Sequence, residues 1–315
     1  MQPNSSINEK SFPSELVLQK MPEVLNWLKS FGFKSLCTRY SRYIKYIDTF
    51  FTVNNPDSEE GRLAFELLIK SYNECLEIVI IKTVFKEEKS NGFKTRLGKV
   101  ITGRDHLNNA AISESRDYLF ELLVAARFSR AGYKVDFDFL TDIVARKEEL
   151  IVYSECKRIT SEKRFKENFD TAGKQLEREM KKTSDSKLGL IFIDVSSILS
   201  KGIQKIEVND ELVAKRILGV AMKQFIAQHA HDIESLNSKH IGHSLGVCLL
   251  GRSSMWTKDF TLYTVTNLDV RASEQLSNSK FSNLEKVLHK FDSAFDDLLC
   301  GNLEKPYNRS NELRE

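Results

Sequence analysis

The sequence has few cysteines and no long apolar run. Its five cysteines, among 315 residues, are widely spaced and form no CxxC pair, which excludes a disulfide framework and a zinc finger of the usual spacing. The longest apolar stretch, LEIVII at residues 76–81, is far shorter than the roughly 20 residues of a membrane-spanning helix. The first fifteen residues contain no apolar signal core. We therefore expect a cytoplasmic protein with no membrane partner.

Sequence motifs for several common chemistries are also missing. There is no glycine-rich phosphate loop and no GxSxG turn, so ATP-driven and serine-hydrolase chemistry have no support. Four of the six histidines lie between residues 229 and 243, but His229 and His231 face different sides of a helix, which disfavours a zinc site. The net charge of +3 permits a nucleic-acid partner without requiring one, because local clustering of charge matters more than its total.

Hydrophobic spacing divides the chain into three parts. Residues 1–95 are predicted to form an all-helical N-terminal region, because apolar residues recur at helical intervals from residue 14 to residue 90. The stretch 89–109 is rich in glycine, asparagine and basic residues, and is the predicted linker. Residues 96–272 form the predicted α/β core. Residues 273–315 are expected to be a last helix, over about 273–300, and a disordered tail.

The core alternates predicted helices and strands. A helix in SESRDYLFELLVAARFSRAGY has Ser113 or Ser115 as a cap candidate and Gly132 as its stop. LGLIFIDV, at 188–195, is a continuous apolar run that is typical of a central strand covered on both faces. The other predicted elements are the strands YKVDFDF, DIVAR, LIVYSECKRI, SLGVCLLG and FTLYTVTN and the helices RFKENFDTAGKQLEREMKK and about 211–235.

Two carboxylates and an ammonium lie in one predicted hairpin. Because side chains alternate along a strand, Glu155 and Lys157 point to the same face. If the turn is centred on residues 148–149, the register places Asp142 opposite Glu155, with Cβ atoms about 5 Å apart. One lysine does not neutralise both acids, whereas a divalent cation does. The sequence therefore predicts a Mg²⁺ or Mn²⁺ site formed by Asp142, Glu155 and the backbone carbonyl of Cys156.

A third acid lies on the helix that precedes these strands. Glu121 interrupts the apolar stripe of that helix, so we expect it on the buried side, where it can reach the metal directly or through water. The alternative is that the hairpin charges form ordinary cross-strand salt bridges. The order of elements favours the metal site, because it places a glutamate helix, the hairpin, a basic helix and an apolar strand in succession.

With these residues in place, the sequence resembles the PD-(D/E)xK nuclease superfamily. The resemblance covers about residues 111–195 and depends on FELLVAARFSRAGYKV with Glu121, TDIVA with Asp142, and SECKR with Glu155 and Lys157. Twelve residues separate the aspartate from the second glutamate, a spacing typical of the family, and threonine stands where the motif has proline. The resemblance implies a restriction-endonuclease-like core, with the element order αβββαβ and a mixed central sheet flanked by helices.

The resemblance also implies metal-dependent hydrolysis of DNA phosphodiester bonds. Asp142 and Glu155 would bind Mg²⁺ or Mn²⁺, and Glu121 would be a further or water-mediated ligand. Lys157 would orient or deprotonate the attacking water and stabilise charge on the phosphate. Gln175 matches a glutamine that faces the site in several branches of the family, the alternative being a solvated helix residue. Many such nucleases act as homodimers or with a partner protein, and stand-alone members often defend against phage or foreign DNA.

Basic residues follow the predicted catalytic strand. Arg158, Lys163 and Arg164 are predicted to contact DNA phosphates, and the helix after them is otherwise explained as a solvated face with internal ion pairs. TRYSRYIKY, at 38–46, is a second candidate for nucleic-acid contact. A core stripe of its tyrosines, with the basic side chains pointing outward, is the favoured explanation there.

Two other functions stay open. One is a non-catalytic nucleic-acid-binding or assembly subunit with the same fold, against which the intact acids and lysine argue. The other is an RNA-directed nuclease, because metal-assisted phosphodiester hydrolysis needs no base contact and the residues that read a 2′-hydroxyl would lie outside the matched segment.

Overall fold

A computed structural model of the chain describes residues 4–8, 12–34, 38–50, 52–53, 58–103, 114–138, 141–181, 187–201, 203, 206–257 and 262–291. The strands are β1 (Asn4–Asn8), β2 (Phe12–Pro13), β3 (Lys134–Asp136), β4 (Ile143–Lys147), β5 (Leu150–Arg158), β6 (Lys187–Asp194), β7 (Glu207–Val208), β8 (Val247–Thr257) and β9 (Leu262–Arg271). The helices are α1 (Ser14–Ser30), α2 (Arg39–Phe50), α3 (Glu59–Val84), α4 (Asn91–Ile101), α5 (Glu114–Arg130), α6 (Phe165–Met180), α7 (Ser196–Leu199), α8 (Glu211–Gln228), α9 (Ala230–Lys239) and α10 (Asn278–Leu288), with a 3-10 turn η3 (Glu162–Arg164).

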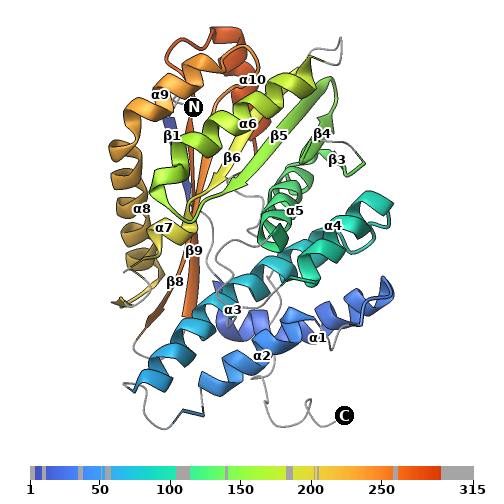
Figure 1. The fold of residues 1–315 in the computed structure, drawn as a ribbon, viewed down its shortest axis with the longest axis vertical. Helices are drawn as coiled ribbons and strands as arrows, with labels where there is room; N and C mark the ends of the chain where they lie inside the picture. The colour runs from blue at the N-terminus through green and yellow to red at the C-terminus, as the bar shows by residue number, and fades with distance from the viewer. Residues whose placement is uncertain are drawn as a thin grey trace.

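The described strands form one mixed sheet (Figure 1). Its order is β1-β9-β8-β6-β5-β4-β3, with β2 paired to β9 and β7 paired to β8. β3, β4 and β5 are antiparallel neighbours, whereas β5, β6 and β8 run parallel. α6 connects β5 to β6, as a parallel pair requires a crossover. The predicted α/β class and mixed sheet are confirmed.

Helices cover both faces of this sheet. Along β6, Leu190 and Phe192 lie in a hydrophobic core that includes α5 and the N-terminal helices, whereas Ile191 and Ile193 lie in a second core with α6, α8 and α9. This alternation confirms the prediction of a central strand buried on both faces. α1 to α4 lie together beside α5 (Figure 1), and their buried residues belong to the first core. The N-terminal helices and the sheet are therefore packed as one hydrophobic unit.

The prediction of an all-helical region over residues 1–95 is wrong at its start. From α1 to α4 the described elements are helical, but β1 and β2 pair antiparallel with β9 and extend the sheet. β1 has a single apolar residue, Ile7, and β2 has two residues, so neither shows an apolar alternation. Their pairing partner lies at least 250 positions later in the chain, where no local pattern indicates it.

The prediction of a boundary or linker over 89–109 is wrong for Asn91–Ile101, which form α4, whereas residues 104–109 lie outside the described residues. The hydroxyl of Ser90 caps the helix by accepting a hydrogen bond from the amide of Phe93. Phe93, Leu97 and Val100 are fully buried and follow helical spacing. The glycine and basic residues between them obscured this stripe.

Several other boundaries differ from those predicted. The helix over about 211–235 is two helices, α8 and α9, separated by His229. The last helix, α10, begins after its cap Ser277 and ends at Leu288, and the predicted tail lies outside the described residues. Ser115 lies inside α5 and is no cap, while Ser113 is outside the described residues. Gly132, with φ +90, ends that helix as predicted.

None of the described helices combines the length and the apolar character needed to span a bilayer.

Candidate functional site

The β4–β5 hairpin has the predicted register. Ile143 pairs with Ser154, and Lys147 pairs with Leu150, so the turn lies at residues 148–149. One step beyond the first pair, the same register sets Asp142 opposite Glu155. The turn and the two-residue period together place both carboxylates at one end of the hairpin.

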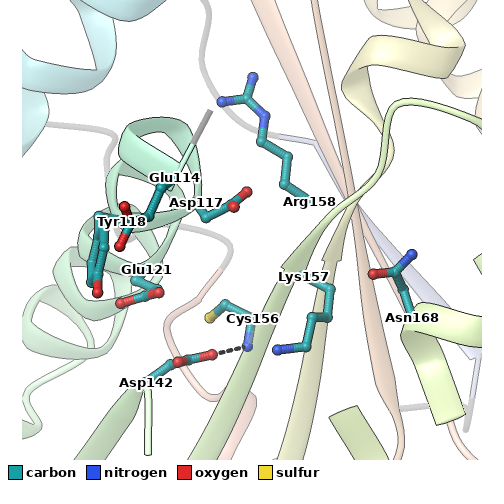
Figure 2. Close-up of a pocket in the computed structure, with 9 residues that line it drawn as sticks. All are labelled: Glu114, Asp117, Tyr118, Glu121, Asp142, Cys156, Lys157, Arg158 and Asn168. Carbon is teal, nitrogen blue, oxygen red and sulfur yellow. Dashed lines mark hydrogen bonds between the residues drawn. The ribbon is translucent and has the colours of Figure 1, made fainter. Parts of the chain in front are cut away.

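Asp142 is fixed by the backbone of the neighbouring strand. Its Oδ2 atom accepts a hydrogen bond of 2.8 Å from the amide of Cys156, as Figure 2 shows. The aspartate directly precedes β4, so its side chain continues the hydrogen bonding between the strands where the β4 ladder has ended. The carboxylate is thereby held between the two strands and α5.

Glu155 and Lys157 share a face, as predicted, and form an incomplete ion pair. The Lys157 ammonium lies 3.6 Å from Glu155 Oε2. Glu155 is only 3% exposed, and its Oε2 makes no hydrogen bond within the described residues. Burial, followed by the charge of Asp142, raises the pKa of Glu155 to about 8 despite the lysine. The lysine therefore does not neutralise the two acids.

Glu121 meets these residues from α5. Its side chain is largely buried, and its Oε2 lies 3.7 Å from Nε of Arg96 on α4. Burial, followed by the charge of Asp142, raises the pKa of Glu121 to about 9, against the opposing effects of Arg96 and Lys157. Glu121, the residue that interrupts the apolar stripe of α5, therefore faces Asp142.

A cavity of about 250 Å³ lies between α5 and β5. It is lined by Glu114, Asp117, Tyr118, Glu121, Asp142, Cys156, Lys157, Arg158 and Asn168. Figure 2 shows Glu121, Asp142 and Lys157 at one end and the Arg158 guanidinium at the other. Glu155 does not line the cavity but adjoins it through its contact with Lys157. Four of the lining residues are acids and two are bases, so negative charge predominates.

The donor set fits a hard divalent cation. The carboxylates that line the cavity outnumber its cations. In addition, the buried Oε2 atom of Glu155 has no hydrogen-bond donor among the described residues. In that part of the chain no group of three or more His, Cys, Asp or Glu side chains forms a ready-made metal-binding cluster. Mg²⁺ does not require one, since it is usually bound through one or two carboxylates and keeps several waters.

The other predicted site residues occupy different surroundings. Gln175 lies on α6 and is not a lining residue, although its Oε1 is buried without a hydrogen-bond partner among the described residues. Arg158 lines the cavity, but its Nε lies 3.0 Å from Oδ2 of Asp194, so the guanidinium is tied to β6. Lys163 and Arg164 are exposed on η3. Their catalytic and DNA-binding roles stay predictions.

The basic helix α6 carries the ion pairs expected of a solvated face. The pairs are Lys166–Asp232, Lys174–Asp170, Arg178–Glu179 and Lys181–Glu177. These contacts leave its positive charge largely compensated within the protein.

The tyrosine stretch at 38–46 is part of the core. Tyr40 and Tyr43 are fully buried, which confirms the favoured explanation. The prediction that its basic side chains point outward is wrong for Arg39, which is also fully buried. Arg39 Nη2 lies 2.9 Å from Oε2 of Glu74 on α3, a partner that no sequence spacing indicated.

Some residues of the site were not found by sequence reasoning. Asp117 precedes Glu121 by four positions and therefore shares its helix face, a signal that was present. Asn168 reaches the cavity from α6. Arg96 had no detectable signal, because the segment that contains it was interpreted as a linker.

No protein-family model and no curated protein matches the chain.

Proposed function

We propose that the protein is a Mg²⁺- or Mn²⁺-dependent nuclease that hydrolyses phosphodiester bonds in DNA. The observation that carries the proposal is the grouping of Asp142, Glu155 and Lys157 beside a cavity that Glu121 also lines. Neighbouring buried carboxylates destabilise the fold unless a bound proton or a cation neutralises them. The protein supplies too little positive charge there, and a divalent ion would supply the rest.

The order of elements supports a restriction-endonuclease-like core. α5, β3, β4, β5, α6 and β6 follow one another along the chain, in the order αβββαβ that the resemblance implies. The antiparallel β3-β4-β5 unit with β6 parallel to β5 also agrees with a mixed central sheet.

The residues of this chain would divide the chemistry between them. Asp142 and Glu155 would hold the metal ion, with the Cys156 carbonyl and Glu121 as further ligands. When bound, the ion would act as a Lewis acid toward the phosphate and lower the pKa of a bound water. The Cys156 amide keeps the aspartate in place. Lys157 would orient the attacking water and stabilise the negative charge that develops on the phosphate.

The size of the cavity is consistent with a polymeric substrate. At about 250 Å³ it is smaller than the roughly 300–1,000 Å³ that encloses a drug-sized ligand. It suits a single phosphate group of a strand that continues outside the cavity, and a homodimer or partner protein would provide the second site for the opposite strand.

Plasmid cleavage with Mg²⁺ or Mn²⁺ tests the proposal. We expect Asp142→Ala and Lys157→Ala each to lower the cleavage rate by about 10³-fold. Lys29→Ala, at an exposed position of α1, is the matched control and should cleave like the wild type. Equal cleavage by all three variants would eliminate the assigned site.

Calorimetric titration with Mn²⁺ separates the alternatives. Binding that is lost in Asp142→Ala and Glu155→Ala supports the metal site. Absence of both binding and cleavage favours a non-catalytic subunit, whereas cleavage of RNA but not of DNA under the same conditions favours the RNA-directed nuclease.

A further inference from the structure

The start of α4 packs closely against Phe137 and Asp138, the two residues that follow β3. The ring of Phe137 packs against Phe85 and Phe93, with centroid distances of 5.3 and 5.2 Å. The amide of Gly92 donates a hydrogen bond of 3.1 Å to Oδ1 of Asp138. A Cβ atom at Gly92 would lie 2.3 Å from the carbonyl oxygen of Phe137, so the approach requires glycine there. The first turn of α4 therefore packs closely against Phe137 and Asp138.

Arg96, one turn later on α4, contacts two backbone carbonyls and the carboxylate of Glu121. Its Nη1 donates to the carbonyl of Phe137, and its Nη2 donates, at 3.5 Å, to the carbonyl of Thr141, the residue directly before Asp142. Its Nε lies 3.7 Å from Oε2 of Glu121. One planar guanidinium thus contacts the backbone that carries the aspartate and the carboxylate on the facing helix.

We propose that Arg96 is a positioning residue of the active site, which holds Asp142 and Glu121 toward the same cavity. The catalytic consequence of this role rests on the proposed function, whereas the contacts of Arg96 do not depend on it. Without the guanidinium, the carbonyls of Phe137 and Thr141 would each lose a hydrogen bond. The Asp142 carboxylate would then be held less firmly in its hydrogen bond with the Cys156 amide. α4, and with it the N-terminal helical region, would be part of the active site.

Lysine at this position would keep the charge without the geometry. An ammonium on a flexible stem does not bridge two carbonyls and a carboxylate in the planar fork that a guanidinium offers. Arg96→Lys therefore separates positioning from simple electrostatic attraction. Lys94→Ala, at an exposed position of the same helix, removes one positive charge without touching the site and is the matched control.

Amide hydrogen exchange at Cys156 measures the positioning directly, because that N–H is bonded to Asp142. We expect Arg96→Ala to lose protection at Cys156 while the amide of Val152, in the middle of β5, stays protected. Mn²⁺ affinity measured by calorimetry should fall about 10–100-fold, as for other residues that orient metal ligands. Arg96→Lys should show a smaller loss in both measurements, and Lys94→Ala should show none.

Unchanged protection at Cys156 in folded Arg96→Ala protein would overturn the inference. If that variant does not fold, Arg96→Lys and Gly92→Ala decide the question by the same measurements, since Gly92→Ala displaces α4 with Arg96 still present. Loss of Cys156 protection in a protein whose wild type neither binds Mn²⁺ nor cleaves DNA would support the positioning and reject the proposed nuclease. If the wild type cleaves DNA but Arg96→Ala leaves Cys156 protection unchanged, the nuclease is supported and the positioning role of Arg96 is rejected.

Discussion

Two equally buried carboxylates, Glu74 on α3 and Glu155 on β5, have very different partners. Both are 3% exposed. Glu74 lies 2.9 Å from Nη2 of Arg39 and 2.6 Å from Nε of Arg116, and it also accepts a hydrogen bond from a tyrosine hydroxyl. Glu155 has one ammonium, that of Lys157, at 3.6 Å. The first acid is fully compensated and the second is not.

Two other buried acids also have guanidinium partners, although burial still raises the pKa of Glu77. Glu77, one turn after Glu74 on α3, forms an ion pair with Arg252 of β8, and Asp194 of β6 pairs with Arg158. In this region the fold supplies a guanidinium for each of these buried acids. Beside the cavity the contacts are weaker: Glu121 has the guanidinium of Arg96 at 3.7 Å, and Glu155 has the ammonium of Lys157 at 3.6 Å. This difference distinguishes buried acids that have a guanidinium partner within hydrogen-bonding distance from Glu155, which has none among the described residues.

Removal of Glu74 should have the largest effect on stability. Glu74→Ala would leave Arg39 and Arg116 buried without their carboxylate, and we expect the free energy of unfolding to fall by about 3–5 kcal/mol. Urea denaturation measures it. The Mn²⁺ affinity of the folded variant should be unchanged. A loss below about 1 kcal/mol would show that the two regions do not differ as described.

Neutralising Glu155 should have the opposite effect on the free energy of unfolding. Glu155→Gln removes a buried charge that the protein does not compensate, so the metal-free protein should gain about 1–2 kcal/mol at pH 8. Urea denaturation in the presence of a chelator measures the gain, and calorimetry should show that Mn²⁺ binding is lost. Glu66→Gln, at an exposed acid of α3, is the control and should change neither quantity. A destabilised Glu155→Gln protein would contradict the comparison.

The dependence of stability on pH follows from the same two acids. The pKa values of Glu121 and Glu155 are raised in the folded state from the ordinary 4.5 to about 9 and about 8. Between the unfolded pKa of 4.5 and the raised pKa values, the folded protein still holds protons that the unfolded chain has released. The free energy of unfolding of the metal-free protein therefore falls as pH rises over this interval. Melting temperatures from pH 5 to pH 9 measure this fall, and saturating Mn²⁺ should reduce it. A rise over that interval would contradict the assignment.

Arg164 should have the smallest effect. Its pair with Glu167, at 3.7 Å, is exposed, so Arg164→Ala should change the free energy of unfolding by less than about 0.5 kcal/mol. If Arg164 contacts a DNA phosphate, DNA affinity should fall by a similar factor for every sequence and the salt-dependence slope should decrease by about 1. Binding titrations at several salt concentrations measure both, with Lys29→Ala as control. An unchanged slope would remove Arg164 from the interface.

The part of the site that could be predicted is local in the chain. The turn at residues 148–149 and the two-residue period place Asp142 opposite Glu155 and place Lys157 beside it. The helical period similarly identifies Glu121 as an acid on a buried face. Each of these inferences needs only neighbours within about 14 positions, a distance over which secondary structure fixes geometry.

The part that could not be predicted depends on distant contacts. Arg96 reaches carbonyls 41 and 45 positions away, and the strands β1 and β2 exist through their pairing with β9. Arg39 was expected at the surface, because nothing near it in the sequence indicates that Glu74 lies beside it. Such contacts depend on how helices and strands pack.

By itself, the sequence determined the alternating helices and strands of the core, the register of the hairpin and the grouping of its charges, because periodicity and turns are local. Only the tertiary structure decided which buried charges are compensated. Arg116 meets Glu74 across 42 positions and Arg252 meets Glu77 across 175, whereas the cation that the described residues place beside Glu155 is the lysine two positions away. Burial makes an unbalanced charge costly, and the balance depends on which distant side chains the fold brings together.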